Sequence, residues 1–314
     1  MARFLFSSPP MLVRSTVFAI AVGTTALAAC RTEPSPSTQT GPATSLAAAD
    51  AGKPKKVGPV DELPIPSAMV DETVNPEKLP PYKGPTGVIE GTVYVTGDPA
   101  PPVMGKSFDK CREGEAFYAK TFREGPTLDG GKRTLADAIV AVTGYGGYYI
   151  PEKRPSKLIS VSHCAYGART IDMTFGQALE VKNEGSKPMF APDFENQPSP
   201  AIMVATLGGD PVRLYPKKPG RYRLVDRIGN TWMDADVFVL LQPLHAVTDA
   251  SGHFRIEGVP VGKLKIGVDH PAIAKQVQKD IEVKDGVVTN VDLTLPNEKA
   301  ALPPPSRNLP PVLP

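Results

Sequence analysis

The sequence predicts an all-β protein built from two β-sandwiches. Period-two alternation of apolar and polar residues recurs between residues 86 and 296, while helical periodicity is almost absent there. The alternating runs are short, and pairs such as Asp129-Gly130 and Pro219-Gly220 separate them. Many short strands with turn residues between them are typical of sandwiches. The residues before and after this range have a different composition.

The N-terminal residues 1–29 predict an export signal. Arg3 and Arg14 form a basic start, and the apolar run 15–29 is too short to remain as a membrane-spanning helix. The ending Leu27-Ala28-Ala29-Cys30 resembles the bacterial lipobox, which implies that Cys30 carries diacylglycerol and becomes the new N-terminus. The alternative is an ordinary secretory signal. Two or more acyl chains anchor a protein stably.

The expected location is therefore the bacterial cell envelope, with the membrane as a partner through the lipid on Cys30. Arg31 follows that cysteine, in place of the aspartate associated with inner-membrane retention. This favours the outer membrane, with the protein facing the periplasm or the cell surface.

Two segments predict disorder. Residues 30–85 are rich in Pro, Ala, Ser and Thr and poor in aromatic residues, and residues 297–314 are rich in Pro. Such compositions bury too little apolar surface to offset the entropy lost on ordering. We expect a tether of about fifty-five residues and a C-terminal tail.

The charge pattern and the absence of catalytic motifs exclude two classes of function. The net charge is +2, and Lys and Arg are interspersed with acids, so nucleic acid is not an expected partner. The sequence contains no G-x-S-x-G motif and no phosphate-binding glycine loop. We therefore expect a protein that is not an enzyme.

The strands follow from the alternation. One segment, 110–123, has weak helical spacing instead. The predicted strands are Gly87–Thr96, Ala138–Thr143, Leu158–His163, Thr170–Phe175, Ala178–Lys182, Ala201–Ala205, Pro211–Tyr215, Arg221–Val225, Asp236–Leu241, Phe254–Glu257, Lys263–Val268, Asp280–Val283 and Val287–Leu295.

Residues 246–268, AVTDASGHFRIEGVPVGKLKIGV, resemble the carboxypeptidase regulatory-like, transthyretin-like sandwich. Gly252 and Gly262 suit the hairpin turns, and Phe254 suits the core. The family's opening Gly-x-Val and Ala-x-Val strands match residues 91–93 and 138–140, far upstream. The resemblance implies one sandwich formed by residues 86–150 plus 246–296.

The intervening residues 152–243 resemble cupredoxin-like Greek-key domains of the plastocyanin, amicyanin and methylamine-utilisation type. The resemblance rests on RYRLVDRIGNTWMDADVFVLL (221–241), SHCAY (162–166) and Asn-Glu-Gly (183–185). It implies a cupredoxin-like domain inserted into the first sandwich.

The residues at the family's copper-ligand positions depart from its pattern. Counting back from Met233, the cysteine position falls on Arg227, or on Asp226 with a one-residue gap, and the histidine falls on Asn230. The other histidine falls on Pro188 or Met189.

A blue-copper centre needs two imidazoles and a thiolate. The remaining candidates are Met233, His163 and Cys164, and the last two are expected to point to opposite faces of one strand. We expect no cofactor, with copper as the alternative, and we expect Trp232 and Met233 to lie in the core.

Two cysteines remain after Cys30. In an oxidising compartment, Cys111 and Cys164 most simply form a disulfide. This bond would join the two sandwiches and stabilise them by about 3–4 kcal/mol. His245, His253 and His270 are dispersed and lack the spacing of a zinc site.

The expected function is that of a non-catalytic, lipid-anchored envelope protein acting as a binding or scaffolding module, with an envelope protein or a glycan as its partner. One alternative is a copper-binding electron carrier or copper-handling lipoprotein with an unorthodox site. A second is a carbohydrate- or peptidoglycan-binding accessory module, which rests on fold analogy.

Overall fold

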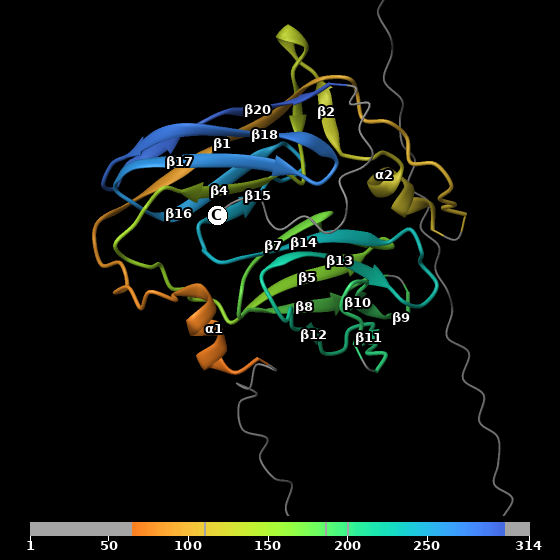
Figure 1. Ribbon diagram of the computed structural model, residues 1–314. Coiled ribbons are helices and arrows are strands. Elements are labelled where there is room, and N and C mark those ends of the chain that lie inside the picture. Colours follow the sequence, from red (N-terminus) through yellow and green to blue (C-terminus); the bar gives the residue numbers. More distant parts are fainter. Residues whose placement is uncertain (1–64, 110, 186, 200, 299–314) are drawn as a thin grey trace, which may run out of the picture. The chain divides into compact units, whose positions relative to one another are not determined.

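The computed structural model describes residues 65–298, except 110, 186 and 200 (Figure 1). The chain divides into two compact units, 1–57 and 58–314, and all described residues belong to the second. The export signal, Cys30 and the C-terminal tail from residue 299 lie outside the described residues. Within those residues, no helix has the length and apolar character needed to cross a membrane.

The described residues are almost entirely β, which confirms the predicted fold class. Their strands form two sets, and the strand pairings in the described residues stay within one set or the other. We call one set the discontinuous sandwich, because its strands come from both ends of the folded region, and the other the inserted sandwich. Figure 1 shows the two sets one above the other.

The discontinuous sandwich has two sheets. In one, β1 pairs with β16, β3, β19 and β20, and β3 also pairs with β2; the other has the order β15-β4-β17-β18. The strands are β1 (Thr86–Gly97), β2 (Glu124–Thr127), β3 (Arg133–Leu135), β4 (Ile139–Thr143), β15 (His245–Val247), β16 (His253–Pro260), β17 (Gly262–His270), β18 (Ile273–Val283), β19 (Val288–Asn290) and β20 (Leu293–Asn297).

The inserted sandwich also has two main sheets, with orders β10-β13-β14-β7 and β12-β8-β5-β6, and a small pair β11-β9. The strands are β5 (Ser156–Ser162), β6 (Ala165–Tyr166), β7 (Thr170–Thr174), β8 (Ala178–Asn183), β9 (Met189–Phe190), β10 (Pro192–Phe194), β11 (Ala205–Thr206), β12 (Val212–Leu214), β13 (Gly220–Asp226) and β14 (Asp234–Leu240).

Each sandwich has its own hydrophobic core. Alternate residues of β1, such as Val93 and Val95, point into the discontinuous core, where Phe254 is also buried. Phe190 and Leu224 are fully buried in the inserted core. The alternation along each strand therefore separates core from surface, as the sequence predicts.

The segment between β1 and β2 contacts both cores: Ala100 and Phe122, near its ends, are buried in the discontinuous core, whereas its middle part packs on the inserted one. It carries η1 (Arg112–Gly114) and α2 (Glu115–Tyr118), which confirms the helical character predicted for residues 110–123. Tyr118 is fully buried in the inserted core, and its hydroxyl accepts a hydrogen bond of 3.1 Å from the Tyr166 backbone N–H. The predicted Cys111–Cys164 disulfide is present, with 6.3 Å between the two Cα atoms.

The last part of the predicted tether is ordered, which corrects the expected disorder of residues 65–85. Helix α1 (Ser67–Val74) lies there, and Ile65, Val70 and Val74 pack against the inserted core. Farther along, the Tyr82 backbone N–H donates to the Tyr149 carbonyl at 2.8 Å. Packing of these few apolar side chains against the inserted core therefore stabilises a helix within an otherwise polar segment.

Several strand predictions differ from the structure in their bounds, and the prediction Asp280–Val283 covers only the end of β18, which begins at Ile273. Of the predicted strand Ala201–Ala205, only Ala205 is part of a strand. The strand predicted to end at His163 ends at Ser162, because His163 and Cys164 adopt positive φ values of 50° and 54° in a turn. The last predicted strand is divided into β19 and β20.

Candidate functional site

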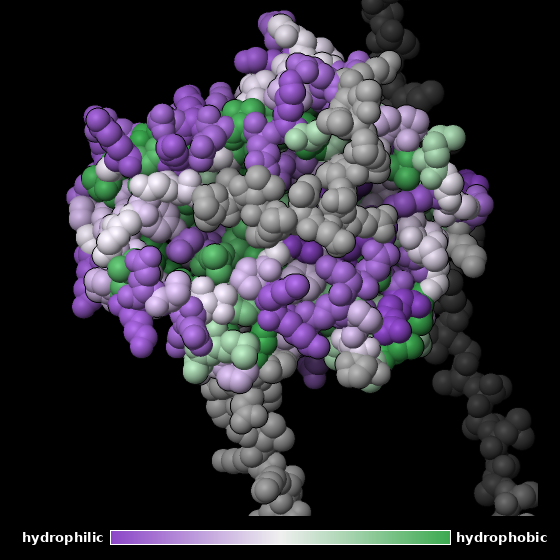
Figure 2. Space-filling view, in the orientation of Figure 1, coloured by the Kyte–Doolittle hydropathy of each residue, from purple (hydrophilic) through white to green (hydrophobic). Residues whose placement is uncertain are grey.

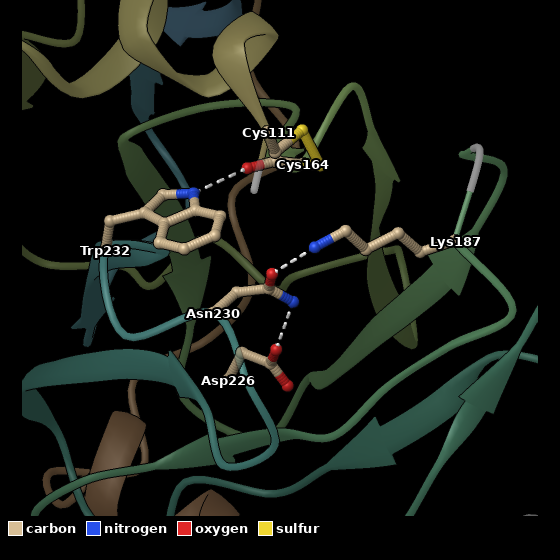
Figure 3. Close-up of a disulfide and its surroundings, with 6 residues drawn as sticks. All are labelled: Cys111, Cys164, Lys187, Asp226, Asn230 and Trp232. Atoms are coloured by element: carbon tan, nitrogen blue, oxygen red, sulfur yellow. Dashed lines mark hydrogen bonds between the residues drawn. A yellow bond between two sulfur atoms is a disulfide. The ribbon is translucent and has the colours of Figure 1, made fainter. Parts of the chain in front are cut away.

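The loop between β13 and β14, residues 227–233, contains three of the positions where the cupredoxin resemblance would place copper ligands (Figure 3). It lies at one end of the inserted sandwich, where Trp232 and Met233 enter the core. The segment leading to β9 supplies Lys187, and the β5–β6 turn supplies Cys164.

A chain of polar side chains occupies the centre of this loop. Lys187 Nζ donates to Asn230 Oδ1 at 2.6 Å, and Asn230 Nδ2 donates to Asp226 Oδ2 at 2.6 Å (Figure 3). Asp226 Oδ1 in turn accepts from the Ala191 backbone N–H at 2.8 Å. Asn230 and Asp226 are both buried, so each polar group in the chain has a partner within the protein.

Asn183 fixes the position of Lys187. It is fully buried, and its side-chain amide donates to the carbonyl oxygens of Lys187 and Ala205, each at 3.1 Å. Its own carbonyl oxygen accepts from the Gly185 backbone N–H. The Asn-Glu-Gly segment that contributed to the cupredoxin resemblance therefore shapes the turn that presents a lysine.

The residue at the expected cysteine position points away from this chain. Arg227 is exposed, and its Nη1 donates to Asp193 Oδ2 at 2.9 Å. Asp193 is buried and also accepts from the Ser199 backbone N–H and hydroxyl. Arg227 thus ties the loop to the segment that follows β10.

Trp232 and Met233 are buried, which confirms the prediction that they are core residues. The Trp232 Nε1–H donates to the Cys164 carbonyl at 3.4 Å (Figure 3), and Phe108 meets the indole edge-on with 6.1 Å between ring centroids. Lys187 Nζ lies 5.4 Å from the centroid of the indole ring, within cation–π range.

The three weak metal candidates do not come together as a ligand set. The Cys164 sulfur is bonded to Cys111, so it offers no thiolate, and the Met233 side chain is enclosed by the core. His163 is exposed in the turn beside Cys164, so the two residues do not lie on opposite faces of one strand as predicted. Within the part of the chain that the structure describes, no group of three or more His, Cys, Asp or Glu residues could hold a metal ion.

A second lysine, in the segment between β1 and β2, supports the loop. Lys106 Nζ donates to the Trp232 carbonyl at 3.1 Å and lies 3.5 Å from the Asp234 carboxylate, which also accepts from Arg223. Burial lowers the pKa of Lys106, and the nearby Asp234 acts in the opposite direction. Sequence analysis missed both Lys106 and Lys187, because their partners lie far away along the chain.

Several apolar side chains are exposed in and near β9 and β11. Met189 lies on β9 opposite Thr206 of β11, and the Leu207 backbone N–H donates to the Pro188 carbonyl. The exposed apolar side chains of these segments are those of Met189, Ile202, Val204 and Leu207. By contrast, Figure 2 shows mostly hydrophilic residues over the region of β17 and β18.

A model of the carboxypeptidase regulatory-like domain family matches residues 221–296. The matched range includes β15 to β20 of the discontinuous sandwich. It also includes β13 and β14, which pair with strands of the inserted sandwich, whereas β1 and β4 lie outside it. Among curated proteins, a search found no match.

Several solved structures of copper proteins resemble part of the chain. A copper-containing nitrite reductase from Thermus scotoductus is 20% identical, with 32% of this chain and 26% of that chain covered and a TM-score of 0.24. An oxidized amicyanin mutant is 11% identical, covering 29% and 88%, with a TM-score of 0.24. Rusticyanin from Thiobacillus ferrooxidans is 12% identical, covering 32% and 86%, with a TM-score of 0.21.

Proposed function

We propose that this protein is a non-catalytic, lipid-anchored cell-envelope protein that serves as a binding or scaffolding module. The observation that carries the proposal is the chain from Lys187 through Asn230 to Asp226, at the loop where the cupredoxin resemblance would place copper. In this reading the inserted sandwich keeps its architecture and holds the loop together with hydrogen bonds in place of metal–ligand bonds.

The chemistry of these residues argues against a copper centre. Copper of the blue type takes a thiolate and two imidazoles, while the loop offers an amide, a carboxylate and an exposed guanidinium. The Lys187 ammonium already donates to Asn230 and would repel a second cation at the same place. The unorthodox alternative would need Cys164, whose sulfur forms the disulfide.

Two further features support a binding role at a membrane. The Leu-Ala-Ala-Cys ending at Cys30 is the basis for the lipid anchor and the envelope location. The exposed apolar side chains of Met189, Ile202, Val204 and Leu207, all in or near β9 and β11, are available for contacts with a partner. Neither feature involves the discontinuous sandwich, so that sandwich can make separate contacts.

Copper loading tests the first part of the proposal. The purified mature protein is incubated with Cu(II) and, separately, with Cu(I), and the bound metal is measured after gel filtration, with an amicyanin as the positive control. We expect no stoichiometric copper and no visible thiolate band. One copper per chain with a strong visible band would contradict the proposal.

Lipid labelling tests the anchor. Cells expressing the wild type are grown with a palmitate analogue, and label and membrane fraction are compared with those of Cys30→Ser and of Cys111→Ser. We expect Cys30→Ser to lose both the label and membrane attachment, and Cys111→Ser to keep both. Label that persists in Cys30→Ser would show that Cys30 is not the lipidated residue.

A further inference from the structure

An open cavity of about 490 Å³ lies on the outer face of the discontinuous sandwich. It is bounded by β1, the start of β20 and the tip of the β2–β3 hairpin, which projects beyond the sheet in Figure 1. Its lining consists of Tyr94, Thr127, Leu128, Asp129, Lys132 and Asp292. None of these residues belongs to the β13–β14 loop or to the proposed lipid anchor.

The floor of the cavity is a tyrosine ring. Tyr94 alternates with the buried Val93 and Val95, so its side chain points away from the core and is only half-buried. Lys132 Nζ lies 5.7 Å from the centroid of this ring. The cavity therefore combines an aromatic surface with an ammonium group above it.

A buried ion pair holds the hairpin wall in place. Arg133 donates through Nε to Glu124 Oε2 at 2.6 Å and through Nη2 to the Asp98 carbonyl at 3.0 Å, which connects the hairpin to the end of β1. Both side chains are about nine-tenths buried or more. At the tip, the Leu128 backbone N–H donates to the Lys132 carbonyl at 2.7 Å. The wall is therefore positioned before any ligand arrives.

The opposite wall is also held in place. Asp292 comes immediately before β20, and its Oδ1 accepts from the Thr92 backbone N–H at 2.9 Å. Its second oxygen has further acceptor capacity toward the cavity. The polar groups that line the cavity are therefore the carboxylates of Asp129 and Asp292, the ammonium of Lys132 and the hydroxyl of Thr127.

This set of groups selects a class of ligand. A phosphate would face two carboxylates and one ammonium, and a wholly apolar ligand would leave the polar groups without partners. A sugar ring carries hydroxyls around its rim, which both donate and accept, and C–H faces that pack on an aromatic ring. The Tyr94 ring and the Leu128 side chain, which is 45% exposed, supply the apolar contacts.

We propose that this cavity binds an uncharged saccharide, with Tyr94 beneath the sugar ring and Asp129, Lys132 and Asp292 at its hydroxyls. The inference rests on the proposed function in one respect, because it gives the binding module a ligand class. The copper and lipid-labelling experiments do not depend on it, so either proposal can fail without the other.

Titration calorimetry and saturation-transfer NMR test the site with chitotetraose, cellotetraose and maltotetraose at up to about 10 mM, a range suited to weak binding. We expect at least one of them to bind, and Tyr94→Ala to weaken binding by about tenfold or more. Tyr94→Phe keeps the ring and should bind like the wild type. Preference for chitotetraose would indicate an amino-sugar glycan, and preference for either glucan would indicate a neutral glucose polymer.

Matched variants separate binding from folding. Tyr215→Ala removes a half-exposed tyrosine of the inserted sandwich and should leave the affinity unchanged. Asp292→Asn keeps the acceptor for Thr92 and should weaken binding. The proposal is overturned if none of the three saccharides binds, or if Tyr94→Ala, with an unchanged circular dichroism spectrum, binds as well as the wild type.

Discussion

His245 Nδ1 lies 2.8 Å from Asp172 Oδ2, and this pair connects the two sandwiches. His245 belongs to β15 of the discontinuous sandwich and Asp172 to β7 of the inserted one, and both side chains are buried. Asp172 Oδ1 also accepts from Lys157 Nζ at 2.5 Å, and the other ring nitrogen of His245 lies 3.2 Å from Thr174 Oγ1. The His245–Asp172 pair is therefore a buried polar contact between the two sandwiches, and Lys157 reaches it from a partly exposed position.

Asp172→Asn should destabilise the protein by about 1–3 kcal/mol, because Lys157 and the buried His245 lose the carboxylate that both of them contact. Burial alone would raise the pKa of Asp172, but the hydrogen bond from His245 and the charge of Lys157 hold it well below its usual range. A lowered pKa contributes stability above about pH 4 that is lost as the pH falls further. Urea unfolding at several pH values should show the difference between variant and wild type shrinking below pH 4.

The matched control for Asp172 is an exposed pair. Arg255 donates to Glu257 at 2.9 Å on the surface, so Glu257→Gln should change the free energy of unfolding by less than about 1 kcal/mol. If Asp172→Asn and Glu257→Gln lowered the free energy of unfolding by similar amounts, the buried His245–Asp172 pair would contribute no more than an exposed pair.

His270 should make the protein lose stability as the pH falls from about 6.5 to about 4. Burial lowers its pKa to about 4, with Asp137 raising it and Arg169 lowering it further, and Phe122 packs edge-on against the ring. The unfolded chain binds a proton near pH 6.5, which the folded protein does not bind until about pH 4. The expected loss at His270 is about 3 kcal/mol.

His270→Asn keeps an acceptor for the Ala272 backbone N–H, which bonds His270 Nδ1 at 3.1 Å. Its unfolding free energy should therefore vary less with pH than that of the wild type, whereas the exposed His253→Gln should keep the wild-type slope. Parallel slopes for wild type and His270→Asn would rule out this source of pH dependence.

Reduction of the Cys111–Cys164 disulfide should lower the free energy of unfolding by about 3–4 kcal/mol. The bond closes a loop with a sequence separation of 53 residues and therefore restricts the unfolded chain. Guanidinium unfolding with and without reductant measures the effect, and Cys111→Ser with Cys164→Ser should match the reduced protein. If reductant still lowered the free energy of unfolding of this double variant, the loss in the wild type would not come from the disulfide.

Lys187→Met should destabilise the protein by about 1–3 kcal/mol. The variant keeps most of the apolar stem but leaves the buried Asn230 Oδ1 without its donor. Lys182→Met, in the exposed pair with Glu184, is the matched control and should change stability by less than about 1 kcal/mol. Thermal unfolding compares the two, and a Lys187→Met variant as stable as Lys182→Met would argue against the Lys187–Asn230–Asp226 chain.

Gly176→Ala should release helix α1 from the inserted sandwich. Gly176 has a φ of +102°, and an added Cβ would come within 2.6 Å of Val70 Cγ1. Limited proteolysis should then cut within residues 65–82 faster than in the wild type. Gly146→Ala, where nothing lies within 4 Å of the added Cβ, should not change the cleavage rate, and equal rates in all three proteins would contradict the contact.

Most of the long strands could be predicted from the sequence because alternation determines which face of a strand is buried. β18 is an exception: most residues of its first part are exposed, so the alternation predicts only Asp280–Val283. β1 and β14 lie almost where the pattern placed them, whereas β6, β9 and β11 have only two residues and carry no pattern. Helix α1 has no side-chain cap and lies within a proline-rich segment, so composition concealed it. Lys187 bonds a residue 43 positions away, and that pairing exists only in three dimensions.

Helix α1 also limits where the protein can work. Because Ile65 is fixed on the inserted core, the proposed anchor at Cys30 is joined to the folded region by 65 − 30 = 35 residue steps, fewer than the fifty-five expected from composition. Even fully extended, 35 residues span at most about 120 Å. In the proposed lipoprotein, Ile65 would thus stay within about 120 Å of the membrane, and any partner or glycan must come within that distance plus the breadth of the folded region.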